Sequence, residues 1–167
     1  MEQKYFMHRI QNEGGNFTKG IEVHDTMDSA ILSFWGRIKT GYNNPSYPNL
    51  DYVSCKITDI NGGVIDSYNL TWKRTGVDLP DKYFMHHIKL DGETFSKDID
   101  ICDSFDQARF TFAAAREYGY DNPKFPNVAL VSCEVTDING AVMRPFAKSW
   151  KIPEEEPTPP EQQQAEA

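Results

Sequence analysis

Histidine is the residue type in this chain best suited to chemistry, and two of the four histidines end the two copies of one short segment. The segment KYFMH ends at His8 and recurs with its last residue at His86, and His87 follows directly. Imidazole is a common general base and metal ligand near neutral pH. No HxH or HExxH spacing accompanies these residues, and no acidic residue stands at metal-ligand spacing. We therefore expect structural histidines with satisfied hydrogen bonds, and an enzyme acting through His8 and His86 is the less favoured alternative.

Lysine and aspartate also recur at equivalent positions and could bind an anion or act as an acid–base pair. Lys19 corresponds to Lys97, and Asp59 corresponds to Asp137. Each aspartate stands where a hairpin turn should begin, a position at which an Asp side chain accepts hydrogen bonds from nearby backbone N–H groups. We therefore interpret the aspartates as turn residues and keep the two lysines as candidate ligands for a small anion.

Two similar proline-containing loops are further candidates for binding. They read YNNPSYPN over residues 42–49 and YDNPKFPN over residues 120–127. Loops often carry binding residues, and asparagine amides beside aromatic rings could bind a base, a sugar or a peptide backbone. The favoured alternative is a rigid crossover that packs against a sheet, because the two prolines restrict each loop. The candidate binding residues of these loops are Tyr42, Asn44, Tyr120 and Asn122.

These residues recur because the chain contains one unit twice. Residues 4–73 align with residues 82–151 at a constant offset of 78 without a gap, and 31 of the 70 pairs are identical. A unit of this size is close to the lower limit for a self-sufficient hydrophobic core, so we expect the two copies to pack on each other.

The pattern within each unit predicts two hairpins joined by a helix. Alternating segments predict strands, and apolar residues at helical spacing predict a helix that starts within residues 26–29, or 104–107 in the second copy, and ends near a glycine. Asn61-Gly62 and Asn139-Gly140 are typical of two-residue hairpin turns. Pro145 indicates that the last strand lies at a sheet edge. The apolar stripe of the second helix is thinner, so we expect that helix to be less buried.

The predicted fold class is therefore α+β, a tandem duplication of a ββαββ unit with antiparallel sheets and one helix per unit packed on a face. The pattern leaves open whether the units form one continuous sheet or two packed sheets. We expect a first repeat over residues 1–75, a linker over 76–81, a second repeat over 82–152, and a disordered acidic tail rich in Pro, Gln and Glu over 153–167.

Charge and cysteine content limit the possible partners and the compartment. The net charge is −8, and five glutamates with no Lys or Arg lie in the tail. The rest contains no block of basic residues, which argues against nucleic acid as a partner. The three cysteines lack CxxC spacing, so we expect free thiols in a reducing compartment. No apolar run approaches about 18 residues, so we expect no membrane span and a cytoplasmic protein.

Three segments carry a resemblance to a known group of proteins. They are KYFMHRI at 4–10, FTKGIEVHDTMDSA at 17–30 and DYVSCKITDINGGVI at 51–65. This pattern resembles small uncharacterised proteins encoded by phages and prophages of gut bacteria. The resemblance implies a phage context, with the host cytoplasm or the virion as location, and it implies no activity and no catalytic residues. The second copy departs from the pattern at Asp98 and Cys102, where the first has Gly20 and His24.

The leading functional hypothesis is a non-enzymatic binding or assembly protein that acts through its paired repeats, with a protein or a small anionic ligand as partner. We predict no catalytic residue, no metal and no cofactor, and the sequence does not define an oligomeric state. The second hypothesis is a counter-defence protein that sequesters a nucleotide signal in a cleft lined by the two tyrosine loops, Lys19 and Lys97. The third is a small enzyme that depends on histidine.

Overall fold

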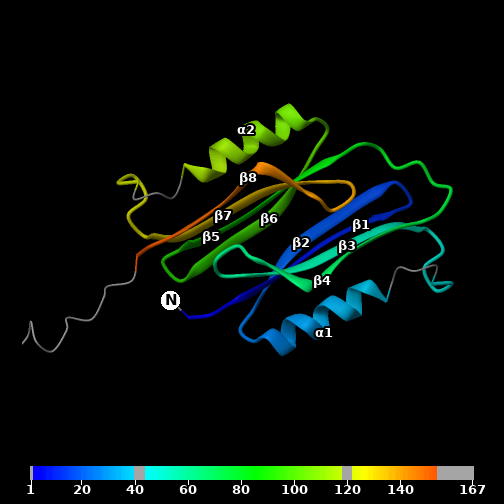
Figure 1. Cartoon of the computed structure of the whole chain (residues 1–167), viewed down its shortest axis with the longest axis horizontal. Helices are drawn as coiled ribbons and strands as arrows, with labels where there is room; N and C mark the ends of the chain where they lie inside the picture. The colour runs from blue at the N-terminus through cyan, green and yellow to red at the C-terminus, as the bar shows by residue number, and fades with distance from the viewer. Residues whose placement is uncertain (1, 40–43, 118–121, 154–167) are drawn as a thin grey trace, which may run out of the picture.

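The computed structural model describes residues 2–39, 44–117 and 122–153, and these residues form two ββαββ units (Figure 1). The first unit contains β1 (Tyr5–Glu13), β2 (Asn16–His24), α1 (Met27–Ile38), β3 (Leu50–Asp59) and β4 (Val64–Lys73). The second contains β5 (Tyr83–Asp91), β6 (Thr94–Cys102), α2 (Phe105–Arg116), β7 (Val128–Asp137) and β8 (Val142–Lys151). The predicted α+β fold of two tandem units is confirmed.

Each unit has its own four-stranded antiparallel sheet, with strand order β2-β1-β3-β4 in the first and β6-β5-β7-β8 in the second. The two sheets face each other, and α1 and α2 cover their outer faces (Figure 1). The described part of the chain therefore forms four layers, helix, sheet, sheet and helix. Of the two arrangements that the sequence left open, packed sheets is the one observed. No helix among the described residues is long and apolar enough to cross a membrane.

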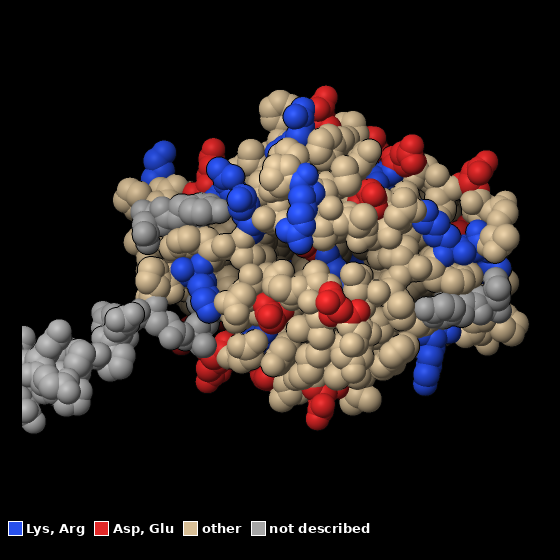
Figure 2. All heavy atoms as spheres, viewed as in Figure 1, with Lys and Arg blue, Asp and Glu red and all other residues tan. Residues whose placement is uncertain are grey.

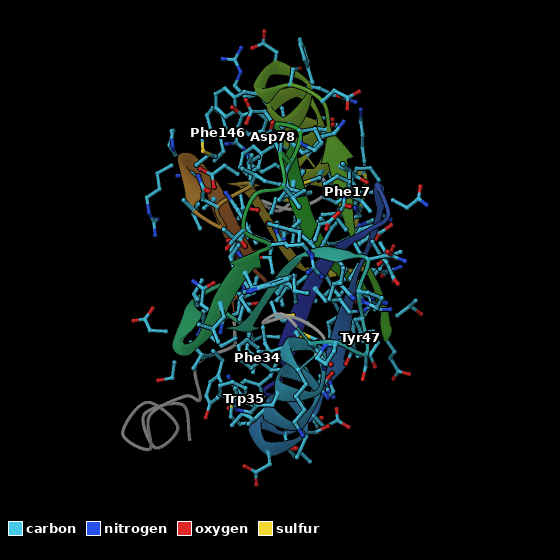
Figure 3. The ribbon with its side chains drawn as sticks, turned by 90° about the vertical axis from the view of Figure 1, so that its right-hand side faces the viewer. Phe17, Phe34, Trp35, Tyr47, Asp78 and Phe146 are labelled. Carbon is cyan, nitrogen blue, oxygen red and sulfur yellow. The ribbon has the colours of Figure 1, made fainter. Side chains whose placement is uncertain are left out.

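An apolar core between the sheets joins the two units. Phe6 packs edge-on to Phe95 with ring centroids 5.8 Å apart, and the equivalent pair, Phe17 and Phe84, has the same separation. Matching contacts at equivalent positions show that a pseudo-twofold axis relates the units. Figure 3 shows Phe17 near the junction of the units, whereas Phe34 lies with α1. The buried members of this inner core are Phe6, Ile10, Ile21, Tyr52, Ile60, Phe84, Ile88, Ile99 and Leu130.

Helix starts are confirmed at the predicted places because both helices have a side-chain cap. The backbone N–H of Ser29 donates to Thr26 Oγ1 at 3.1 Å before α1, and that of Gln107 donates to Ser104 Oγ at 3.1 Å before α2. A hydroxyl in this position satisfies one of the free N–H groups of the first turn. The glycines predicted to end the helices, Gly41 and Gly119, lie outside the described residues.

The outer cores differ between the units as expected. Helix α1 buries three side chains, including Ile38, whereas α2 buries only Ala108 and Phe112 and has Arg116 in the place of Ile38. Trp72 packs into the core beneath α1, and the equivalent tryptophan of β8 packs beneath α2. The thinner apolar stripe of the second helix therefore produces a smaller buried face.

The hairpin turns lie at the predicted positions, but the two-residue turn type is wrong. Gly62 N donates to Asp59 O at 3.0 Å, and Asp59 N donates to Gly63 O at 2.9 Å, so the loop contains three residues. Asp59 Oδ1 accepts hydrogen bonds from the N–H groups of Asn61 and Gly63, which confirms its role as a turn residue. With these hydrogen bonds to the Asp59 side chain, the loop has three residues instead of two, and Gly62 adopts a φ of 82°.

Each hairpin loop also packs against the other unit. A Cβ atom at Gly62 would collide with Ser149 Oγ on β8, and one at Gly140 would collide with Thr71 Oγ1 on β4. The loops accept only glycine here for two reasons, positive φ and close approach. β8 is an edge strand, so the expectation from Pro145 is confirmed.

We predict that the inner core supplies more stability than any exposed aromatic residue. The change Phe84→Ala should lower the free energy of unfolding by about 3–5 kcal/mol, because it leaves a cavity between the sheets. The matched change Phe110→Ala removes the same side chain from a position that is 78% exposed, and should cost less than about 0.5 kcal/mol. Urea denaturation measures both values, and equal losses would contradict the assignment of the inner core.

Candidate functional site

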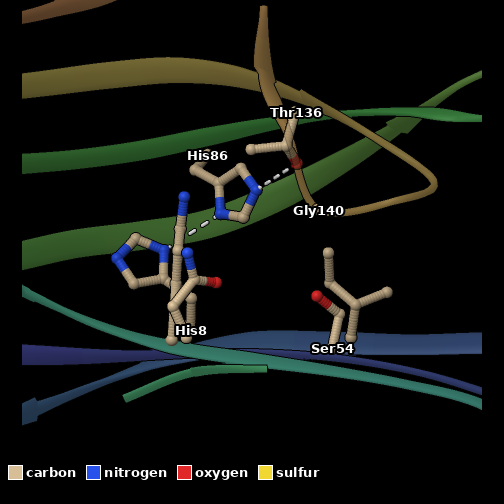
Figure 4. Close-up of a pocket in the computed structure, with 8 residues that line it drawn as sticks. His8, Ser54, His86, Thr136 and Gly140 are labelled. Carbon is tan, nitrogen blue, oxygen red and sulfur yellow. Dashed lines mark hydrogen bonds between the residues drawn. The ribbon is translucent and has the colours of Figure 1, made fainter. Parts of the chain in front are cut away.

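The two histidines of the repeated segment meet between the sheets on the pseudo-twofold axis. His8 projects from β1 and His86 from β5, and their Nδ1 atoms lie 2.9 Å apart (Figure 4). His8 Nε2 lies 2.8 Å from Thr58 Oγ1, and His86 Nε2 lies 2.9 Å from Thr136 Oγ1. Each histidine is only 3% exposed, and both nitrogens of each ring have a hydrogen-bond partner.

The arrangement determines how protons are shared. Burial, and secondarily the charge of Lys56, lowers the pKa of His8 and His86 well below the ordinary value, so both imidazoles are neutral near pH 7. A neutral imidazole has one N–H and one acceptor nitrogen. The two facing Nδ1 atoms can hold one proton between them, so one ring is the Nδ1–H tautomer and the other the Nε2–H tautomer. The hydroxyl of one threonine donates and that of the other accepts.

A charged pair lies beside the histidines, at positions 56 and 134, which are equivalent in β3 and β7. Lys56 Nζ contacts Glu134 Oε1, and the two residues are 5% and 9% exposed. Burial lowers the pKa of Lys56 to about 7, and the Glu134 carboxylate acts in the opposite direction by favouring the charged ammonium. Sequence reasoning missed this pair. Its signal was the change from Lys to Glu between otherwise similar strands, VSCKITD and VSCEVTD.

A small cavity adjoins these groups. Its volume is about 10 Å³, which is close to the space that one water molecule needs. Ile10, Ser54, Asn69 and Gly140 complete its lining together with the histidines, Lys56 and Thr136 (Figure 4). A substrate larger than water does not fit. A metal ion could be held by His8, His86 and Glu134, because one ligand atom from each lies within 4.8 Å of the others.

The other candidates from the sequence do not join this cluster. Lys19 Nζ forms an ion pair with Asp98 of the second unit, at 3.2 Å from both carboxylate oxygens, whereas Lys97 is exposed on β6. Asn44 Nδ2 donates to Lys39 O, and Asn122 makes the equivalent bond to the end of α2. Both amides therefore hold their own loops, as in the rigid-crossover interpretation. Tyr42 and Tyr120 lie outside the described residues.

The second unit contains a groove between α2 and its sheet that sequence reasoning did not identify. Its volume is about 330 Å³, and its floor is formed by Met85, Val131 and Cys133. Ala114 and Ala115 of α2 form one wall. Polar groups stand at its rim, where His87 Nε2 lies 3.6 Å from Asp100 Oδ2.

The equivalent place in the first unit is filled by a polar cluster around Glu22. The carboxylate accepts hydrogen bonds from Ser33 Oγ at 2.6 Å and His24 Nε2 at 2.9 Å, and nitrogens of Arg9 and Arg37 lie 4.0 Å away. Partial burial opposes ionisation, but these hydrogen bonds and charges hold the pKa of Glu22 below its usual value.

The second unit lacks most of this cluster, because shorter side chains stand at four of its positions. The substitutions from the first unit to the second are Arg9 to His87, Glu22 to Asp100, His24 to Cys102 and Arg37 to Ala115. The groove results from these replacements. Its signal in the sequence was the run of small residues in the second helix, which alone does not distinguish an open groove from closer packing.

The surface around these features has no single sign of charge on the face in Figure 2, where basic and acidic side chains are interspersed over both units. Comparison of the chain with protein-family models, with curated proteins and with solved structures finds no match. The functional proposals below therefore rest on the geometry of the described residues.

We predict that the histidine pair makes the fold sensitive to acid. Because the folded-state pKa values lie well below 6.5, the unfolded chain binds more protons, and stability falls as the pH drops below about 6.5. Two such groups give a slope of at most about 2.7 kcal/mol per pH unit. Urea denaturation between pH 7 and 5, with a chelator present, measures this slope.

Two variants assign the slope to the buried pair. His86→Gln keeps a donor and an acceptor but removes one titrating group, so the slope should fall by about half. The control Phe110→Ala removes an exposed side chain that does not titrate, and it should leave the slope unchanged. Equal slopes in the wild type and His86→Gln would show that other groups cause the acid sensitivity.

Proposed function

We propose that the protein is a non-enzymatic binding protein, in which the paired units form a fixed scaffold and the groove of the second unit receives an apolar side chain of a partner protein. The observation that carries this proposal is the groove of about 330 Å³ at a place that the first unit fills with its Glu22 cluster. The phage or prophage origin implied by the sequence resemblance is part of the same proposal.

The buried polar groups support a scaffold rather than a catalyst. His8 and His86 bind each other and two threonines, and Lys56 contacts Glu134, so each of these groups already has a partner within the chain. A catalytic base must lie within hydrogen-bonding distance of a proton on its substrate. The cavity beside the histidines has space for about one water molecule, which does not favour the histidine-dependent enzyme.

The chemistry of the groove favours an apolar anchor with a polar neighbour. Its floor consists of apolar and thiol side chains, and burying an apolar side chain there contributes about 25 cal/mol per Å². Phe110 lies one helical turn before Ala114 on α2 and is 78% exposed, so it extends the apolar surface beyond the groove. The rim offers the carboxylate of Asp100 for a hydrogen bond to the partner.

The structure provides less support for a nucleotide ligand. That hypothesis needs Lys19 to bind an anion, and the Lys19 ammonium pairs with Asp98 instead. The amides of Asn44 and Asn122 bind their own loops. The groove is therefore the better candidate for a binding surface.

We predict that filling the groove abolishes partner binding. Ala115→Arg places in the second unit the residue that the first unit has at Arg37, and its side chain should occupy the groove. Immobilised full-length protein can be incubated with a lysate of its natural host and the bound proteins quantified by mass spectrometry. A true partner should be reduced at least about tenfold on Ala115→Arg, because the loss of an interface anchor costs more than about 1.4 kcal/mol.

The matched control is Arg37→Ala, which shortens the equivalent side chain in the first unit. It should retain every partner that the wild type binds. Thermal denaturation shows whether both variants remain folded. Binding of the same proteins, in the same amounts, to Ala115→Arg and to the wild type would exclude the groove as the binding surface.

A further inference from the structure

We propose that His8, His86 and Glu134 bind a divalent transition-metal ion, with zinc as the best-fitting class, on the axis between the two units. The three ligand atoms come from β1, β5 and β7 and lie within 4.8 Å of one another. Two imidazoles and one carboxylate form a donor set that zinc uses in proteins. The site lies between the sheets, apart from the groove under α2, so this inference does not depend on the proposed function.

The distance between the two imidazoles is close to that of a metal site. Zinc–nitrogen bonds of about 2.0–2.1 Å at a tetrahedral angle place two ligand nitrogens about 3.3 Å apart. The Nδ1 atoms of His8 and His86 lie 2.9 Å apart. Metal binding requires this separation to increase by about 0.4 Å and both rings to rotate, so that the two Nδ1 lone pairs point at the ion instead of at each other.

The threonines provide the outer support that a metal-binding histidine needs. A histidine that binds metal through one nitrogen usually donates the N–H of the other to a fixed acceptor, which orients the ring. Thr58 Oγ1 and Thr136 Oγ1 stand 2.8 and 2.9 Å from the two Nε2 atoms. With metal bound, both rings adopt the Nε2–H tautomer and both threonines accept. The proton shared between the Nδ1 atoms moves to Nε2 of its own ring, so the histidines release no proton.

Lys56 is the competitor for this site. Its ammonium contacts the Glu134 carboxylate, which must leave it to bind a metal ion. The ammonium and a metal ion compete for the same carboxylate, so removing the ammonium should strengthen metal binding. The adjoining cavity of about 10 Å³ has space for one water as a fourth ligand.

Titration of the untagged, chelator-treated full chain with Co²⁺ and Zn²⁺ tests the proposal. We expect one ion per chain and a visible Co²⁺ absorption typical of tetrahedral coordination. Calorimetry with Zn²⁺ should show one binding event per chain, with the same stoichiometry as the Co²⁺ titration. Absence of a Co²⁺ spectrum and of binding heat in both the wild type and Lys56→Gln would overturn the proposal.

Variants assign the signal to this cluster. His86→Ala should abolish binding, and Thr58→Val should weaken it by about 10–100-fold. Lys56→Gln should bind more tightly than the wild type, because the competing ammonium is absent. His87→Ala removes a neighbouring histidine outside the cluster and should bind as the wild type does. Binding that survives His86→Ala but not His87→Ala would place the metal at the surface and overturn the proposal, and Thr58→Val and Lys56→Gln keep the test decisive if His86→Ala does not fold.

The proposal for the groove and the proposal for the metal site can be tested separately. Ala115→Arg alters the groove alone and should leave the Co²⁺ spectrum unchanged. A loss of the spectrum in Ala115→Arg would contradict the independence of the two sites, whereas a loss of partner binding with an intact spectrum affects only the proposed function.

Discussion

Residues on the pseudo-twofold axis meet their own counterparts from the other unit, and this constraint shapes the centre of the molecule. A neutral imidazole can face a second imidazole, because it contains both a donor and an acceptor. Both positions can therefore hold the same residue type, and the Nδ1 atoms of His8 and His86 form a hydrogen bond of 2.9 Å. A charged side chain cannot face its own copy in a buried site, since like charges repel strongly there. Positions 56 and 134 hold Lys and Glu and form an ion pair.

The same constraint gives the two halves of the chain different roles. Two copies of the first unit would bring Lys56 against a second lysine, and two copies of the second would bring Glu134 against a second glutamate. Because Lys56 and Glu134 carry opposite charges, packing of the first unit against the second is favoured over packing of two copies of the same unit. Polar residues in a core can serve such specificity even where they add little net stability.

The inner faces of the two sheets pack against each other, so the helices pack on the outer faces. Phe6 of β1 packs in the inner core and its neighbour Met7 packs beneath α1, so one strand supplies two cores. The units are then free to differ on their outer sides. The first retains the Glu22 cluster, and the second has the groove at Ala115.

Much of the fold could be predicted from the sequence because its signals are local. Thr26 and Ser104 mark the helix starts, and Asn61-Gly62 marks a hairpin. The turn type could not be predicted from that dipeptide, since the Asp59 carboxylate binds two backbone N–H groups and lengthens the loop. The packing of the sheets was left open, although the apolar pattern of β1, with Phe6 and Met7 both buried, is typical of a strand covered on both faces.

The candidate sites were less predictable, because they depend on contacts between the units. The repeated segment drew attention to the two histidines, but nothing local indicates that they meet each other across the axis. Lys56 and Glu134 lie on strands of separate units, and only the packing of those strands makes them partners. The groove arises from side chains that are small, and Ala115 has no chemical signature of its own.

The central claim is that Lys56 and Glu134 form a buried pair that holds the units in register, and a double-mutant cycle measures this most directly. Lys56→Met, Glu134→Leu and the double variant can be compared with the wild type by urea denaturation in the presence of a chelator. Each single change should cost about 3–5 kcal/mol, because it leaves one buried charge unpaired, and the double variant should cost far less than the sum. Single changes that cost less than about 1 kcal/mol, or effects that simply add, would contradict the account.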